Sequence, residues 1–293
     1  MLLQLLANGF ITGCEYALVA LGFALIYNTI RVFHFAHGAL YTFAVYLFYS
    51  LFVGLKLPVW LAALVAVGAA VVAGPLIDEL IYAPLNKRSA SSLIQMLSSL
   101  GIYIVIVNLI AMFYGNETKV LLPGIQPTFK LGGIILTRIQ VIILIAFIII
   151  FFLLHFLLKN SNLGVLIRAM RDNPQLVSVM GINPRPIRWS VMAIGTGLAG
   201  AAAILSGLDV GIDPNIGMTA FLNGAVAVII GGIGRFETAA FGGLMLGLIQ
   251  SLVIWQASAR WQDMITFLIL VLFLLFKPEG IFGVRRRVEE SSL

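Results

Sequence analysis

Long apolar runs dominate this chain. The most extreme of them, "IQVIILIAFIIIFFLLHFLL" at residues 139–158, contains no acidic residue, lysine or arginine. A helix of about 20 such residues crosses the apolar core of a bilayer. Only 10% of the residues are charged, against about 25% in soluble domains, so one globular core could not bury this surface. Because the runs are continuous rather than alternating, as barrel strands are, the sequence predicts an all-α, polytopic helical membrane protein.

Nine runs of this kind follow one another along the chain. Eight are long enough to form full transmembrane helices, and the ninth, at 219–233, is short and glycine-rich, which predicts a short, broken or re-entrant helix. No connection is long enough for a soluble domain, so residues 1–293 are expected to form a single transmembrane domain. The runs cover residues 5–28, 36–54, 58–82, 93–113, 134–158, 187–207, 219–233, 238–256 and 262–277.

Basic residues between the runs indicate the orientation, because lysine and arginine accumulate on the cytoplasmic side. If the loop at about 159–188 is cytoplasmic, thirteen basic residues lie inside and five outside. We therefore expect the N-terminus outside and the C-terminus inside. The inside set is Arg31, Lys87, Arg88, Lys159, Arg168, Arg171, Arg185, Arg188, Arg235, Lys277, Arg285, Arg286 and Arg287, and the outside set is Lys56, Lys119, Lys130, Arg138 and Arg260.

The same placement explains the net charge of +6 without a nucleic-acid partner. The only cysteine, Cys14, lies in an apolar run and can form no disulfide within the chain. Nothing in the sequence indicates a metal or cofactor site. The nucleotide-binding pattern G-x-x-x-x-G-K-[ST] is absent as well, and no pattern indicates an enzyme.

The stretch "GVLIRAMRDNPQLVSVMGINPRPIRW", residues 164–189, interrupts the apolar pattern with four arginines and three prolines. It predicts a two-turn helix at 174–180. Asn173 can cap this helix and Pro174 fits its first position. Gly181 suits the left-handed residue that follows a helix end, and Arg168 and Arg171 precede the helix.

One face of this short helix is apolar. Leu176, Val179 and Met180 share it by helical spacing, whereas Val177 is expected at its flank, where a substitution should matter less. An exposed apolar face of this kind suits docking into a groove of a protein partner. The alternative is an interfacial helix whose neighbouring arginines meet anionic lipid headgroups.

Several stretches, in order, resemble the branched-chain amino-acid (LivH-type) permeases of ABC importers. They are "NGFITGCEYALVALGFALIYNTIRVFHFAHGALY", "YAPLNKRS" with "LIQMLSSLGIYI", "RAMRDNPQLVSVMGIN", "AFLNGAVAVIIGGIGRFETAAFGGLMLGLIQ" and "KPEGIFG". Together they extend over nearly the whole chain. The resemblance implies a permease domain in a bacterial or archaeal cytoplasmic membrane, with residues 174–180 as the cytoplasmic coupling helix.

The resemblance also implies partners. These are a second permease subunit, two cytoplasmic ATP-binding subunits and an extracytoplasmic substrate-binding protein. The expected cargo is a branched-chain or related amino acid. A self-sufficient secondary transporter or channel is the alternative, but such carriers usually bury several ionisable groups near the membrane centre, and here we identify only Glu15.

Glu15, Asn108 and Asn223 are polar residues inside predicted spans and are therefore candidates for the translocation path. A carboxylate near the membrane centre costs about 2.5–3.5 kcal/mol, so Glu15 should face protein or water. It could contact the ammonium group of a substrate, or sit protonated against another helix. The two asparagines could instead join helices to one another.

Small residues mark two candidate packing faces. Ala239, Gly243 and Gly247, followed by Ser251, recur every four residues and let another helix approach closely. Gly195 and Gly200 do the same in an earlier span. Ordinary helix packing explains both faces, and sliding of these helices as a pore opens is the functional alternative.

Overall fold

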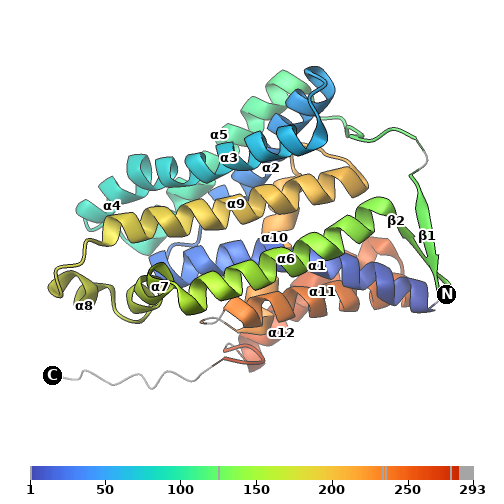
Figure 1. Ribbon diagram of the computed structural model, residues 1–293. Coiled ribbons are helices and arrows are strands. Elements are labelled where there is room, and N and C mark those ends of the chain that lie inside the picture. Colours follow the sequence, from blue (N-terminus) through green and yellow to red (C-terminus); the bar gives the residue numbers. More distant parts are fainter. Residues whose placement is uncertain (1, 125, 233, 235, 278, 284–293) are drawn as a thin grey trace.

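The computed structural model describes residues 2–283 apart from 125, 233, 235 and 278 (Figure 1). Among these residues, eight helices are long and apolar enough to cross a membrane, and one shorter apolar helix accompanies them. The predicted all-α, polytopic membrane fold is therefore confirmed.

The helices and strands follow the chain in this order: α1 (Leu2–Ile30), α2 (Ala36–Tyr49), a π-helical turn (Ser50–Gly54), α3 (Val59–Ile77), a second π-helical turn (Asp78–Tyr82), α4 (Ala83–Lys87), α5 (Ser92–Tyr114), β1 (Thr128–Leu131), β2 (Ile134–Thr137), α6 (Arg138–Asn160), α7 (Asn162–Asp172), α8 (Pro174–Val179), α9 (Pro184–Val210), α10 (Ile216–Gly231), α11 (Phe236–Gln256), a 3₁₀ turn (Ala259–Trp261) and α12 (Gln262–Phe276).

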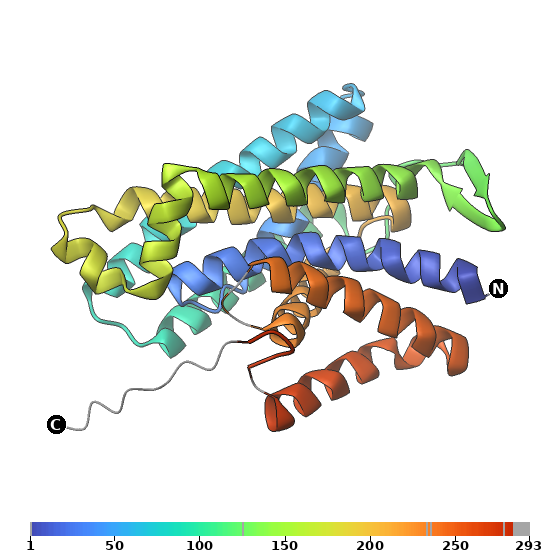
Figure 2. The same cartoon turned by 60° about the horizontal axis from the view of Figure 1, so that its bottom comes forward.

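The bundle has two distinct ends. The β1–β2 hairpin and the start of α1 lie at one, which we call the hairpin end, and α4, α7 and α8 lie at the other, the α8 end (Figure 1). The long helices run between these ends (Figures 1 and 2). The membrane normal is therefore expected to run along these helices. Neither α7 nor α8 is among the helices long and apolar enough to cross a membrane.

Helices α1 and α9 form the centre of the bundle. In the apolar segment of each of these two helices, 78% of the residues are buried inside the bundle. In α3, α5 and α6 the buried share is 22%. The exposed sides of these outer helices carry large apolar residues such as Leu64, Val105 and Ile149. Such faces suit contact with lipid or with another membrane subunit.

Helix α10 is the short helix that the sequence indicates. Its 16 residues span about 24 Å, and it runs across the neighbouring long helices rather than along them (Figures 1 and 2). Before it, Ile212 bridges to Lys119 in the loop that leads to the hairpin. After it, the Gly234 carbonyl accepts a hydrogen bond from Arg171 of α7. The helix thus returns the chain from the hairpin end to the α8 end.

The structure differs from the sequence prediction at two boundaries. Residues 134–137 form strand β2 rather than the start of a helix, and α6 begins only after Thr137, whose side chain and Gln140 form a capping box. The span predicted at 58–82 continues in helical form to Lys87. Of the basic residues used for the orientation, Arg235 and Arg285–Arg287 lie outside the described residues.

Candidate coupling surface and translocation path

Helix α8 has the caps that the sequence indicates. The Asn173 side chain accepts a hydrogen bond from the Leu176 backbone N–H at 3.0 Å, and Pro174 occupies the first turn. Gly181 has φ +78°, a conformation that glycine adopts without the strain of a side chain. The helix ends at Val179, and Met180 is its C-terminal cap.

The apolar face of α8 is uncovered. Leu176, Val179 and Met180 are 56%, 82% and 70% exposed. Val177 is only 3% exposed and belongs to the hydrophobic core. The expectation that Val177 lies at a tolerant flank is therefore wrong. Its side chain holds α8 on the bundle, while the other three residues, which we call the α8 face, are directed away from it.

The two arginines before α8 bind the backbone of the bundle. Arg171 donates to the Gly234 carbonyl at 2.8 Å, and Arg31, at the end of α1, donates to the Arg171 carbonyl at 2.9 Å. Arg168 donates to the Leu158 carbonyl of α6. Helix α7 is thus tied to α1, to α6 and to the turn between α10 and α11, so a displacement of α8 would be transmitted to several membrane helices.

An acidic pair that the sequence analysis missed lies beside this region. Arg188 of α9 forms a two-pronged ion pair with Asp78, through Nε–Oδ2 at 3.2 Å and through Nη2–Oδ1, and the Asp78 side chain is 2% exposed. Arg185 pairs in the same way with the more exposed Glu79. The signal was present in "PLIDELIY", where two acids interrupt the apolar run predicted at 58–82.

Replacing Arg188 with leucine should destabilise the protein by about 3–5 kcal/mol, because it leaves the Asp78 carboxylate buried without a partner. The double variant Arg188→Leu/Asp78→Asn should recover most of the loss. Thermal unfolding of the purified protein measures both. An Arg188→Leu variant as stable as the double variant would contradict the prediction.

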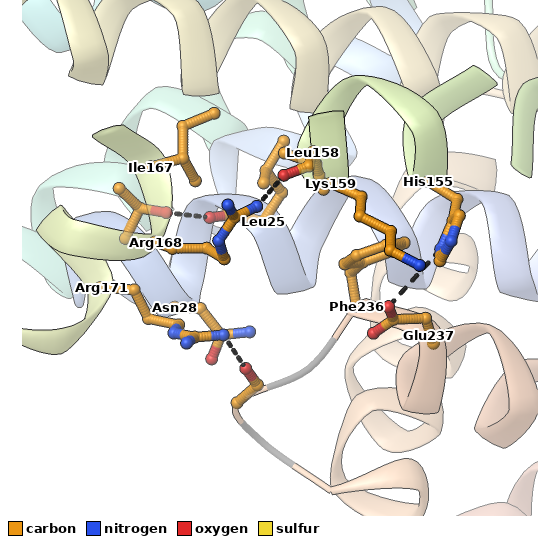
Figure 3. A pocket seen from close by; sticks show the side chains of 12 residues that line it. Leu25, Asn28, His155, Leu158, Lys159, Ile167, Arg168, Arg171, Phe236 and Glu237 are labelled. Carbon is orange, nitrogen blue, oxygen red and sulfur yellow. Dashed lines mark hydrogen bonds and ion pairs between the residues drawn. The ribbon is translucent and has the colours of Figure 1, made fainter. Parts of the chain in front are cut away.

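A cavity of about 570 Å³ opens at the α8 end between α1, α6, α7 and the start of α11 (Figure 3). Arg168, Arg171 and Lys159 line it, together with His155 and Glu237, whose Nδ1 and Oε1 atoms lie 3.6 Å apart. This basic cavity is distinct from the α8 face. It lies alongside the ends of the membrane helices.

A polar network inside the membrane joins four helices. Tyr16 of α1 donates to Gln250 of α11 at 2.8 Å, and Gln250 donates to Asn223 of α10 at 3.2 Å and to Thr266 of α12 at 2.7 Å. Asn223, a candidate path residue, therefore makes an interhelical contact. Sequence reasoning missed Gln250, although it is a polar residue within the predicted run at 238–256.

Glu15 lies on another side of α1 from Tyr16 and is half-buried. It faces Ser206 and Asp209 on α9, and Tyr41 of α2 faces the same serine. Asp209, a second acid, is therefore close enough to Glu15 to interact with it electrostatically. Asn108 does not join this cluster, because it lies on an exposed side of α5 and bonds to the Ile104 carbonyl of its own helix.

The small residues lie at close helix contacts. A Cβ atom added to Gly243 would lie 2.5 Å from the Ala17 nitrogen, and one added to Gly247 would lie 2.3 Å from the Gly13 nitrogen. Ala239 is fully buried in the same helix. A Cβ atom added to Gly195 would lie 2.9 Å from the Gly22 carbonyl oxygen of α1, whereas one added to Gly200 would lie 3.2 Å and 3.3 Å from the Cβ atoms of Ala70 in α3 and Ala44 in α2. The two helices α1 and α11 are therefore in backbone contact.

Comparison with known proteins gives matches over almost the whole chain. The family model "Branched-chain amino acid transport system / permease component" matches residues 5–274. BraD, a high-affinity branched-chain amino acid transport permease of Pseudomonas aeruginosa, is 32% identical over 98% of this chain and 97% of its own length.

Other relatives agree. The permease LivH of Escherichia coli is 30% identical over 98% of this chain and 97% of its own, and a probable LivH of Methanocaldococcus jannaschii is 28% identical over 91% and 88%. No solved structure gives a significant match. This chain therefore belongs to the family of branched-chain amino acid transport system permease components.

Proposed function

We propose that this chain is one of two membrane permeases of an ABC importer and that it carries branched-chain or related amino acids. The match to BraD and LivH over nearly their full lengths carries this proposal. A relative of M. jannaschii named as a probable LivM permease matches 60% of the chain at 26% identity, which suits a pair of similar permeases. Energy would come from separate ATP-binding subunits, with substrate delivered by an extracytoplasmic binding protein.

The α8 face is the proposed contact with an ATP-binding subunit. Three apolar side chains are exposed on a helix that lies at the α8 end, outside the helices long enough to cross a membrane. The caps make the helix rigid, and the arginine contacts link α7 to the end of α1, to α6 and to the turn before α11. Closure of the ATP-binding subunits would push this helix and move the membrane helices.

Reconstitution tests the proposal. The chain, purified with its membrane and ATP-binding partners and supplied with a binding protein, should take up leucine, isoleucine or valine only when ATP is present. A panel of other amino acids and amides would define the cargo. Uptake by the chain alone without ATP would instead support a secondary transporter or channel.

The orientation can be measured with single cysteines in a variant that lacks Cys14. A cysteine at position 3 should react with an impermeant maleimide added from outside, because the excess of basic residues predicts that the α8 end is cytoplasmic. A cysteine in place of Ser178 should react only after the membrane is opened. Labelling of position 178 in intact cells would overturn this orientation.

We further propose that Glu15 lines the path and meets the ammonium group of the substrate. A carboxylate that faces another acid within the membrane would be stabilised by an arriving cation. Glu15→Gln should reduce uptake by about tenfold or more, since it removes a charged hydrogen-bond partner. Asn108→Ala, on the exposed side of α5, should leave uptake unchanged. Full uptake by Glu15→Gln at limiting substrate would contradict a role in the path.

A further inference from the structure

The basic cavity at the α8 end has an excess of positive charge. Lys159, Arg168 and Arg171 line it, and Glu237, the one acid among its described lining residues, lies against His155. Asp172, next to the cavity, pairs with Arg171. In Figure 3, Arg168 and Arg171 extend from α7 and Lys159 extends from α6. Such a site favours an anion.

Two of these cationic side chains, Lys159 and Arg168, have N–H donors that are not used in the hydrogen bonds described above. Among the described residues, neither Lys159 nor Arg168 forms an ion pair with an acid. Arg168 uses one nitrogen on the Leu158 carbonyl, and a guanidinium carries five N–H groups. The Lys159 side chain is exposed and can supply three more donors. A phosphate group, with several acceptor oxygens and a negative charge, matches this set.

Much of the remaining lining is apolar, although Asn28 and Thr29 of α1 also line the cavity. Leu25, Ile167 and Phe236 line the cavity. On α6, Phe152 and Phe156 are 63% and 67% exposed, and they lie at positions i and i+4 of a face on which Lys159 is i+7. An apolar strip of a membrane helix therefore leads to the cavity's cations.

We propose that this cavity binds the phosphate headgroup of an anionic membrane lipid, with its acyl chain along Phe152 and Phe156. The charge selects the headgroup, and the apolar strip favours a lipid over a free phosphate ion. Basic pockets between membrane helices at the level of the headgroups bind such lipids in the same way. The acidic surface of a protein partner would match the cations but would not need the membrane-facing strip.

Lipid binding to the full-length protein, purified in detergent with its associated subunits, tests the proposal without any transport measurement. The probe is fluorescent phosphatidylglycerol, with fluorescent phosphatidylcholine as the neutral comparison. Lys159→Gln should weaken phosphatidylglycerol binding by about fivefold, the contribution of one basic residue near an anionic lipid. Lys159→Gln/Arg168→Gln should weaken it by about 30-fold, and phosphatidylcholine binding should not change.

Arg88→Gln is the matched control, because Arg88 is an exposed cation at the same end of the bundle but outside the cavity. It should bind phosphatidylglycerol normally. The Lys159 side chain makes no hydrogen bond or ion pair within the described residues, so its variant tests the site even if the double variant is unstable.

Three results would overturn the proposal. One is normal phosphatidylglycerol binding by Lys159→Gln. Another is displacement of the lipid by millimolar inorganic phosphate, which would assign the site to a free anion. The third is loss of an associated subunit from Lys159→Gln with lipid binding intact, which would make the cavity a protein contact. Because none of these depends on the cargo, a failure here is distinguishable from a failure of the proposed function.

Discussion

Replacing Leu176 and Met180 with aspartate should abolish uptake and substrate-stimulated ATP hydrolysis together. Both side chains are more than half exposed on the α8 face. If an ATP-binding subunit covers that face, the variant buries two unpaired carboxylates, at a cost of several kcal/mol. The permease itself should still insert and fold, because neither residue packs in its core. ATP-binding subunits should be lost when the variant is purified.

Ser178→Asp is the control, because it adds a carboxylate to an exposed position of the same helix outside the α8 face. It should retain the ATP-binding subunits and most of the uptake. Val177→Asp is unsuitable, since Val177 is buried against the bundle and a carboxylate there would detach the helix by another route. If the Leu176/Met180 variant keeps its ATP-binding subunits and transports normally, α8 is a membrane-surface helix and not the coupling element.

Local signals made α8 predictable from the sequence. A capping asparagine, a proline at the first position and a glycine after the end act within one or two turns, and all three have the expected geometry. The position of Val177 could not be inferred in this way. Which side of a short helix contacts the bundle depends on where the neighbouring helices lie.

The ion pair between Asp78 and Arg188 could not be predicted from local sequence either. Asp78 and Arg188 are 110 positions apart, so only the packing of α3 against α9 brings them together. The hairpin, by contrast, had a local signal that was passed over. Gly132 and Gly133 both have positive φ, as a two-residue hairpin turn requires, and the apolar residues after them were assigned to the next helix. Apolar length alone does not separate a strand from the start of a span.

For the path, the sequence identified the polar residues but not their arrangement. Glu15 and Asn223 both lie at interior helix contacts, whereas Asn108 lies on an exposed side. A polar residue within an apolar run is expected to contact protein or water rather than lipid. Which helix it faces follows from the packing of α1 against α9, α10 and α11, and glycine spacing was the only sequence signal for that packing.

Replacing Gly247 with leucine should prevent recovery of a folded complex. The spacing of Ala239, Gly243 and Gly247 predicts a close contact, and the structure places the partner in α1. A Cβ at Gly247 would lie 2.3 Å from the Gly13 nitrogen and 2.5 Å from the Gly9 carbonyl oxygen. These are backbone atoms, so a change of side-chain rotamer cannot relieve the overlap. Helices α1 and α11 would have to move apart. Overpacking a core costs about 1–3 kcal/mol even where side chains can adjust, and here the cost should be larger.

Gly101→Leu provides the matched control for this prediction. Gly101 is also a helical glycine in a membrane span, but nothing lies within 4 Å of the Cβ position. Leucine there should be accepted with normal yield and uptake. Gel filtration of the detergent-solubilised protein and uptake in cells measure both variants. Because α1 is the central helix and α11 its closest neighbour, normal assembly and transport of Gly247→Leu would mean that α1 and α11 are not in backbone contact in the working protein. A Gly247→Leu variant that assembles but does not transport would instead indicate that this contact must slide during the cycle.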